Sequence, residues 1–340
     1  MRRLAISISL FMSSLPAAAI AEDLPSFTLE FSAWNATDVV VVNESGVVRE
    51  VWKGSLKPNA VLPVGQWKIT AAADVSYDRL GLDRSKLPAD RIKRVTGKRR
   101  VIFLRREAEG GEWKAASIFE DWDAATIWVE GDEGFAKQQW MNPGPSLIRP
   151  YSSEKKVRDS VLRIAKTQSS IETAAQLKDP AARAQALVKF LDGKNYLALD
   201  ETLEGLKTCG KDVWSVIRPL LEDESKLPIH SRLIHVAGTA SLEQAKPLIE
   251  RVIAEEMEYW NSLTEEQQKG GSYNEPMHFH YSKLSACLNV LKRSGYADEK
   301  GLVAKLRKKW DKSPNLKHLG TSSGGRSPIL QYADEILKKQ

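Results

Sequence analysis

The stretch MNPGPSLIRP at residues 141–150 separates two parts of the chain whose hydrophobic patterns differ. Its three prolines and its glycine are unsuited to the interior of a helix or of a central strand. Before this stretch, apolar residues alternate with polar ones or form short runs; after it, they recur every three or four residues. We therefore predict an α+β protein in separate domains: a β-rich domain at 22–140, a linker at 141–152 and an α-helical domain at 153–340.

The β-rich domain is predicted from short apolar or alternating segments separated by turn residues such as Asn43-Glu44-Ser45-Gly46. Many short strands with turns between them are typical of an all-β sandwich or a small barrel, and both folds remain open. The expected strands are 27–31, 39–42, 47–52, 67–70, 100–104, 113–119, 126–129 and 135–140.

Three motifs of this domain follow one another in order: VVREVWKG at 47–54, LKPN at 56–59 and GKRRVIFL at 97–104. A strand ending in Lys-Gly, a turn, and Gly-Lys followed by an apolar strand ending in Phe-Leu resemble exported netrin-like and tissue-inhibitor-like barrels of the OB type. The resemblance covers roughly half of the domain, and the cysteines of that family are absent from it. It implies a small barrel in place of a sandwich.

Seven of the ten tryptophans lie in the β-rich domain, at positions 34, 52, 67, 113, 122, 128 and 140. Large rings on alternating strands usually fill a core, so we expect most of them to be buried. The alternative is a platform on which sugar rings stack. Trp122, between Asp121 and Asp123, is the candidate binding ring. Two carboxylates so close in sequence do not by themselves form the cleft of a glycosidase.

Residues 76–98 form a long, highly charged connection. Connections of this length are uncommon unless they are functional or mobile. Arg79, Arg84 and Arg91 are therefore candidate binding residues, and the other interpretation is a solvated helical turn or a flexible insert.

From Ser153 onward the spacing of apolar residues predicts short amphipathic helices. Asp179-Pro180 predicts a helix start with Asp179 as its cap, and Gly210 and Gly295 predict helix ends. The helices are expected in antiparallel pairs. Units starting near 196, 228, 278 and 327, with no strands between them, are typical of an α-solenoid.

The clearest unit is LPIHSRLIHVAGTASLEQAKPLIERVI at 227–253, with a first helix ending at Ala237-Gly238 and a second opening at Pro247. This unit resembles a HEAT repeat, and the resemblance extends less regularly over residues 180–338. It implies an all-α HEAT-like solenoid that serves as a protein-binding scaffold and carries no catalytic residues.

Cys209 and Cys287 are the only cysteines. If the repeats stack in order, these residues fall in units that are not neighbours, and only neighbouring units touch in a solenoid. We therefore predict two buried free thiols and no disulfide.

His278 and His280, with Tyr273 close by, form the densest cluster of possible ligands, and all three are candidate binding residues. Two histidines at this spacing point the same way on a strand and apart on a helix. Zinc would need a third ligand from His230, His235 or His318. We expect surface or helix-cap histidines, with no metal and no cofactor.

The segment GTSSGGRS at 320–327 matches a phosphate-binding loop with Arg in place of Lys. A poor strand precedes it and only one helix follows, so we expect a flexible connection. The chain has no G-x-S-x-G, no H-E-x-x-H and no Cys/His nucleophile pair. No catalytic residue is predicted, and a non-enzymatic protein is favoured.

The N-terminus has the layout of a secretory signal peptide: Arg2 and Arg3, an apolar run from Leu4 to Leu15, and the small residues Ala19 and Ala21. The apolar run is too short to span a bilayer. We expect cleavage between Ala21 and Glu22, which lowers the formal net charge from +6 to +4. The mature protein is expected in the periplasm or secreted, without a membrane span and without a nucleic-acid partner.

Together these observations predict an exported, non-enzymatic binding or scaffold protein, expected to be monomeric. Its helical-repeat surface would hold a protein or cell-envelope polymer partner. The alternative is an exported hydrolase or glycan-binding protein with its site in the tryptophan-rich β domain.

Overall fold

The computed structural model describes residues 27–70, 73–76, 92–108, 110–138, 147–191, 196–269, 275–320 and 325–338. Within them an antiparallel sheet is followed by a helical region, which confirms an α+β protein with separate domains. The chain divides into two compact units, unit 1 (residues 1–169) and unit 2 (residues 170–340). The expected signal peptide and most of the charged segment 76–98 lie outside the described residues. None of the described helices combines the length and apolar composition needed to cross a bilayer.

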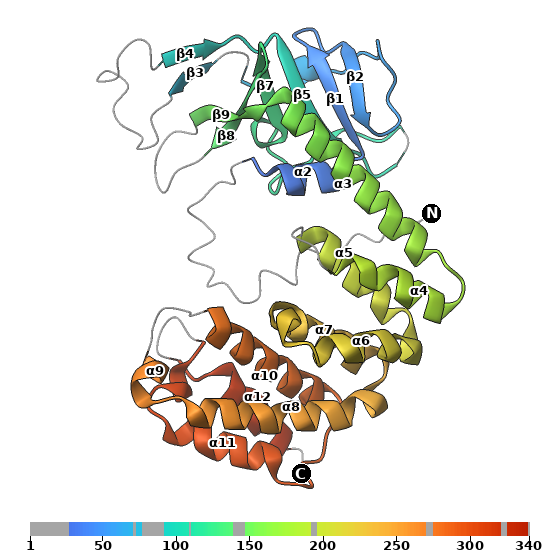
Figure 1. Cartoon of the computed structure of the whole chain (residues 1–340). Helices are drawn as coiled ribbons and strands as arrows, with labels where there is room; N and C mark the ends of the chain where they lie inside the picture. The colour runs from blue at the N-terminus through green and yellow to red at the C-terminus, as the bar shows by residue number, and fades with distance from the viewer. Residues whose placement is uncertain are drawn as a thin grey trace. The chain divides into compact units, whose positions relative to one another are not determined.

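Unit 1 is built on an antiparallel sheet (Figure 1). The spatial order is β2 (Val48–Lys53), β1 (Asp38–Asn43), β5 (Arg99–Arg105), β7 (Thr126–Glu130), β8 (Glu133–Gln138) and β9 (Leu147–Ser153). The short β6 (Lys114–Ala115) pairs with β5, and β3 (Ala73–Ser76) pairs with β4 (Ile92–Val95) in a separate two-stranded sheet.

Strand β1 is buried on both faces, which explains its continuous apolar run Val39–Val42. On one face, Val40 and Val42 pack with Ile102, Leu104, Val48, Leu62 and Val64 in one apolar cluster. On the opposite face lies Phe103, whose ring centroid is 5.3 Å from that of Phe27, just before helix α2 (Leu29–Asn35).

Helix α3 (Glu154–Ala175) crosses the sheet (Figure 1) and buries Val157, Val161 and Ile164 at helical spacing. Lys53 of β2 joins the two helices to the sheet. Its Nζ donates hydrogen bonds to the carbonyl oxygens of Ala33 and Trp34 at the end of α2, at 2.7 and 3.2 Å, and to Oε1 of Gln168 on α3, at 2.8 Å.

Several expected strands of unit 1 are wrong. Residues 29–31 are the first residues of α2, in which Leu29, Ala33 and Trp34 are buried with helical spacing. Residues 67–70 form no strand, and only Lys114–Ala115 of the stretch 113–119 does.

The expected linker at 141–152 overlaps strand β9, and residues 141–146 lie outside the described residues. Pro150 lies in an end strand of the sheet order, next to an irregularity in its register with β8, and both are positions where a strand tolerates proline.

Unit 2 is a two-layered array of helices. Two sets of helices alternate along the chain. The first set consists of α4 (Pro180–Leu187), α6 (Trp214–Leu221), α8 (Leu242–Ser262) and α11 (Leu302–Lys312). The second set consists of α5 (Tyr196–Lys207), α7 (Leu227–Ala240), α10 (Glu275–Arg293) and α12 (Pro328–Leu337). The short α9 (Glu265–Lys269) lies between α8 and α10. Helix α5 contacts α7, α7 contacts α10 and α10 contacts α12, so these four helices form one continuous layer.

The ends of several helices agree with the sequence. Asp179 caps α4 by accepting hydrogen bonds from the N–H groups of Ala181 and Ala182. Gly210 and Gly295 adopt positive φ angles of 57° and 66°, a conformation that favours glycine where a helix ends.

The second helix of the unit at 227–253 begins earlier than predicted. Helix α8 starts at Leu242 and contains Pro247, while α7 continues past Gly238 to Ala240. Because Pro247 has no N–H, only the carbonyl of Glu243 loses its hydrogen bond within the helix. Both residues are exposed, so water can bond to that carbonyl.

Three buried side chains of unit 2 carry polar or titratable groups. Cys209 and Cys287 are free, buried thiols. His230 on α7 is fully buried, and its Nε2–H donates to the carbonyl oxygens of Leu220 and Asp223, both at 3.0 Å. His230 therefore satisfies a carbonyl in the last turn of α6 in its neutral form.

The stability of the protein should fall in mild acid. Burial lowers the pKa of His230 and of His235 below the usual value, and the charges of Lys283, Arg293 and Lys207 act in the same direction. The unfolded chain thus binds protons more readily below about pH 6.5. The free energy of unfolding, measured in urea, should then decrease by up to about 1.4 kcal/mol per pH unit for each of the two histidines.

The variant His230→Gln isolates one of these groups. Its pH slope below about pH 6.5 should be shallower than that of the wild type. The control is Gln244→Ala, which replaces an exposed side chain without a titratable group and should leave the slope unchanged. Equal slopes in the wild type and in His230→Gln would contradict the assignment.

Candidate functional site

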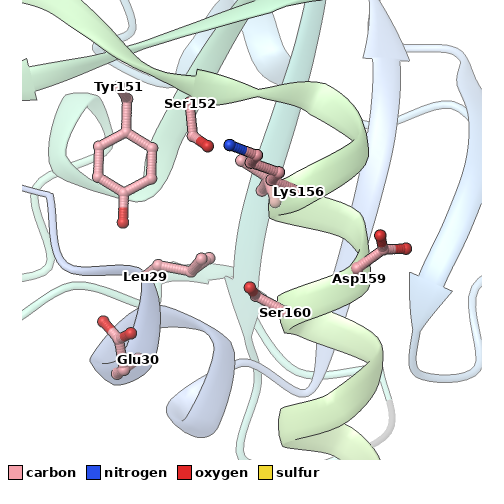
Figure 2. A pocket seen from close by; sticks show the side chains of 8 residues that line it. Leu29, Glu30, Tyr151, Ser152, Lys156, Asp159 and Ser160 are labelled. Atoms are coloured by element: carbon pink, nitrogen blue, oxygen red, sulfur yellow. The ribbon is translucent and has the colours of Figure 1, made fainter.

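A pocket of about 580 Å³ opens in unit 1 where α2, the end of β9 and the start of α3 meet (Figure 2). Most of the side chains around it are polar, and they include both charges. The lining consists of Leu29, Glu30, Tyr151, Ser152, Lys156, Val157, Asp159 and Ser160.

Tyr151 forms one wall of this pocket. Its ring packs edge-on against Phe27 with a centroid distance of 5.1 Å. Burial raises the pKa of the Tyr151 phenol, and the negative charge of Glu30 raises it further. The hydroxyl therefore keeps its proton at neutral pH and can donate a hydrogen bond.

The sequence did not single out any residue of this pocket. Its lining comes from a segment predicted as a strand, a segment predicted as a linker and the first turns of a predicted helix. The residues are far apart in sequence, and no motif joins them. Only the packing of α2 beside α3 brings them together.

Trp67, Trp113 and Trp122 form a second feature of unit 1, called here the tryptophan face. Trp34, Trp52 and Trp128 are buried, as predicted for most rings, and Trp140 lies outside the described residues. Trp67, Trp113 and Trp122 are half-buried and pack against the apolar cluster of Val40 and Ile102.

The rings of the tryptophan face are held in place by neighbouring groups. Trp67 and Trp122 stack with centroids 4.0 Å apart and an interplanar angle of 6°. The guanidinium of Arg106 lies 4.3 Å from the ring centroid of Trp113. The segment before Trp122 leaves two adjacent large apolar side chains in contact with solvent, since Ile118 and Phe119 are 40% and 51% exposed.

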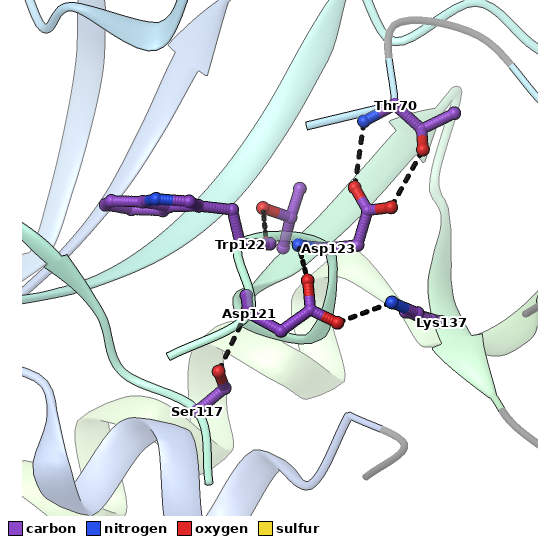
Figure 3. A network of polar contacts seen from close by, with 7 residues as sticks. Thr70, Ser117, Asp121, Trp122, Asp123 and Lys137 are labelled. Carbon is purple, nitrogen blue, oxygen red and sulfur yellow. Dashed lines mark hydrogen bonds and ion pairs between the residues drawn. The ribbon is translucent and has the colours of Figure 1, made fainter. Parts of the chain in front are cut away.

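The two carboxylates beside Trp122 build a turn (Figure 3). Asp123 accepts hydrogen bonds from the N–H and the hydroxyl of Thr70, both at 2.8 Å. Asp121 accepts from the N–H of Asp123 at 3.0 Å and forms an ion pair with Lys137. Both carboxylates thus have partners within the fold, and they do not face each other across a cleft.

Four candidate residues lie outside the described residues: Arg79, Arg84, Arg91 and Tyr273. The glycine-rich segment at 320–327 is described only in part, because residues 321–324 lie outside as well.

The two candidate histidines point apart on α10. His278 is exposed, whereas His280 is half-buried and stacks on Tyr259 with a centroid distance of 3.7 Å. The Nδ1–H of His280 donates to the carboxylate of Glu256 on α8, at 3.0 and 3.1 Å from its two oxygens.

Glu256 is the centre of a buried ionic cluster. Its side chain is 2% exposed, and the Nζ of Lys283 lies 3.2 Å from its Oε1, with Lys283 itself buried. The carboxylate therefore has two partners on α10, the ammonium group of Lys283 and the imidazole of His280.

The sequence identified only His280 of this cluster. A signal for the partner was present, because Glu256 falls in the same helical phase as the buried Ile249, Ile253 and Trp260. A charged residue in a buried phase requires a partner.

Two of the other histidines considered as zinc ligands, His230 and His318, contact the backbone instead. His230 contacts two carbonyl oxygens, and Nδ1 of His318 lies 2.9 Å from the carbonyl oxygen of Gly325. In the part of the chain that the structure describes, no three His, Cys, Asp or Glu side chains are grouped so as to hold a metal ion.

Comparison with protein-family models, with curated protein sequences and with solved structures found no match to this chain.

Removing the buried carboxylate should strongly destabilise the protein. Glu256→Gln leaves Lys283 buried without its counter-charge, and breaking a buried ion pair in this way costs about 3–5 kcal/mol. The free energy of unfolding from urea titration measures the loss.

The matched control is Glu255→Gln, one residue earlier on α8. Glu255 is exposed and lies 3.6 Å from Arg251, so this change should cost less than about 1 kcal/mol. Similar losses in the two variants would show that Glu256 is not the anchor of this cluster.

Proposed function

We propose that this chain is an exported, non-enzymatic binding protein whose unit 2 holds a protein or cell-envelope polymer partner. The observation that carries the proposal is the continuous layer formed by α5, α7, α10 and α12, in which each helix contacts the next. Stacked helix pairs create an extended surface, and HEAT-like arrays use such surfaces to bind other macromolecules.

The carboxylates of two candidate clusters, at Trp122 and at His280, support binding over catalysis. A general acid or base must be free to exchange a proton with a substrate. Asp121 and Asp123 hold a turn, and Glu256 is enclosed between His280 and Lys283.

The alternative is a glycan-binding protein or hydrolase with its site in unit 1. The observation that favours it is the tryptophan face, because aromatic rings with exposed surface can stack on sugars and other apolar surfaces. Glycan binding is the better form of this alternative, since Asp121 and Asp123 do not flank a cleft as the carboxylates of a glycosidase do.

Export is part of the proposal and rests on the layout of residues 1–21. The mature protein, sequenced from its N-terminus, should begin at Glu22. Ala21→Trp places a large ring at the cleavage position and should leave the precursor uncut, whereas the control Ile20→Leu should be processed normally. A mature protein that retains Met1 would contradict export.

Site-specific photo-crosslinking in the exported, full-length protein tests which surface is used. A benzophenone side chain is placed singly at exposed positions of the helical layer: Glu204, Thr239 and Gln331. Partner crosslinks are expected from these positions, because a bound macromolecule would lie along the layer.

Matched controls are exposed positions on helices of the other layer, Gln244 on α8 and Lys308 on α11, where crosslinks should be absent. A further position, Phe119, reports on the tryptophan face. Crosslinks from Phe119 alone would favour the alternative, and crosslinks equally from both layers would contradict a defined binding surface.

A further inference from the structure

We propose that the pocket between α2, β9 and α3 binds a short peptide by its two charged ends. The carboxylate end would be held by Lys156 and the amino end by Glu30. This site lies in unit 1 and is independent of the surface proposed for unit 2.

The positive end of the pocket is formed by Lys156 with two hydroxyl groups. Figure 2 shows the amine of Lys156 beside the hydroxyl of Ser152, with the hydroxyl of Ser160 directed into the same space. Among the described residues, no carboxylate is within ion-pair distance of Lys156. An ammonium group with adjacent hydroxyl donors is suited to a carboxylate.

The negative end is formed by Glu30 on the other side of the opening. The hydroxyl of Tyr151 points toward Glu30 (Figure 2), and the charge of Glu30 contributes to the raised pKa of that phenol. Glu30 is exposed and, within the described part of the chain, has no basic side chain as partner. A carboxylate beside a protonated phenol is suited to an ammonium group and to a neighbouring carbonyl oxygen.

The base of the pocket is apolar, because Leu29 and Val157 are buried there. Asp159 lies on the rim with its carboxylate directed away from the centre (Figure 2). The volume of about 580 Å³ is in the range of sites for small organic ligands and is far larger than a single ion requires.

A short peptide matches this arrangement better than a simple anion or a neutral sugar. Opposite charges on opposite sides select a ligand that carries both charges. The hydroxyls of Tyr151, Ser152 and Ser160 can bond the N–H and C=O groups between those ends. A small side chain on the peptide would rest on Leu29 and Val157.

Calorimetric titration of the mature, full-length protein with trialanine tests the proposal. Lys156→Gln and Glu30→Gln should each weaken binding about tenfold, because each removes one charge pair. Lys155→Gln is the matched control: it removes an exposed charge from the adjacent position of α3, outside the pocket lining, and should leave the affinity unchanged. Lys156 and Glu30 are exposed, so thermal unfolding should show that all three variants remain folded.

Two blocked peptides assign the direction of binding. Amidation of the carboxyl end of trialanine should weaken binding to the wild type about tenfold and have little further effect on Lys156→Gln. Acetylation of the amino end should likewise weaken binding to the wild type about tenfold and have little further effect on Glu30→Gln. Absence of binding at about 10 mM trialanine would overturn the proposal. So would equal affinities of the blocked and free peptides, or equal losses in Lys155→Gln and Lys156→Gln.

Discussion

Burial of strand β1 on both faces is the constraint on which unit 1 depends. Val39–Val42 have no exposed surface, so the sheet must be covered on each side. Burying a valine side chain fully contributes about 1.5–3 kcal/mol, so the loss of either cover would remove a large part of the stability. Helices α2 and α3 provide one cover, and the segment with Leu62, Val64 and the tryptophan face provides the other.

Both candidate sites of unit 1 lie at the margins of these covers. The peptide pocket opens where α2, β9 and α3 converge without closing. The tryptophan face is the part of the second cover whose rings remain half-exposed. The polar groups beneath that face, such as Asp121 and Asp123, hold the turn that presents Trp122. In this unit, polar side chains between the sheet and the elements packed on it support the fold. Side chains at the edges of those elements are available to a ligand.

Unit 2 was predicted well in outline because amphipathic spacing and helix-ending glycines are local signals. The helical units are expected to start near 196, 228, 278 and 327, and the corresponding helices begin at Tyr196, Leu227, Glu275 and Pro328. The errors also have local causes: Pro247 is accommodated near the exposed start of α8, and the alternation at 27–31 was too short to distinguish a strand from the approach to a helix. His280 was found by residue type, but its partner Glu256 lies on another helix.

The sequence by itself determined the two classes of domain and the point where one periodicity replaces the other, because these depend on residues close together along the backbone. The tertiary structure alone decided which groups face each charged side chain. Glu256 gains two partners, Lys283 and His280, across a helix interface, whereas Glu30 and Lys156 face a shared pocket from different elements. The physical reason is that the local pattern shows at most that a charged residue lies in a buried helical phase, as Glu256 does, and does not show which groups pack against it. Whether it supports the fold or meets a ligand depends on what packs against it from elsewhere in the chain.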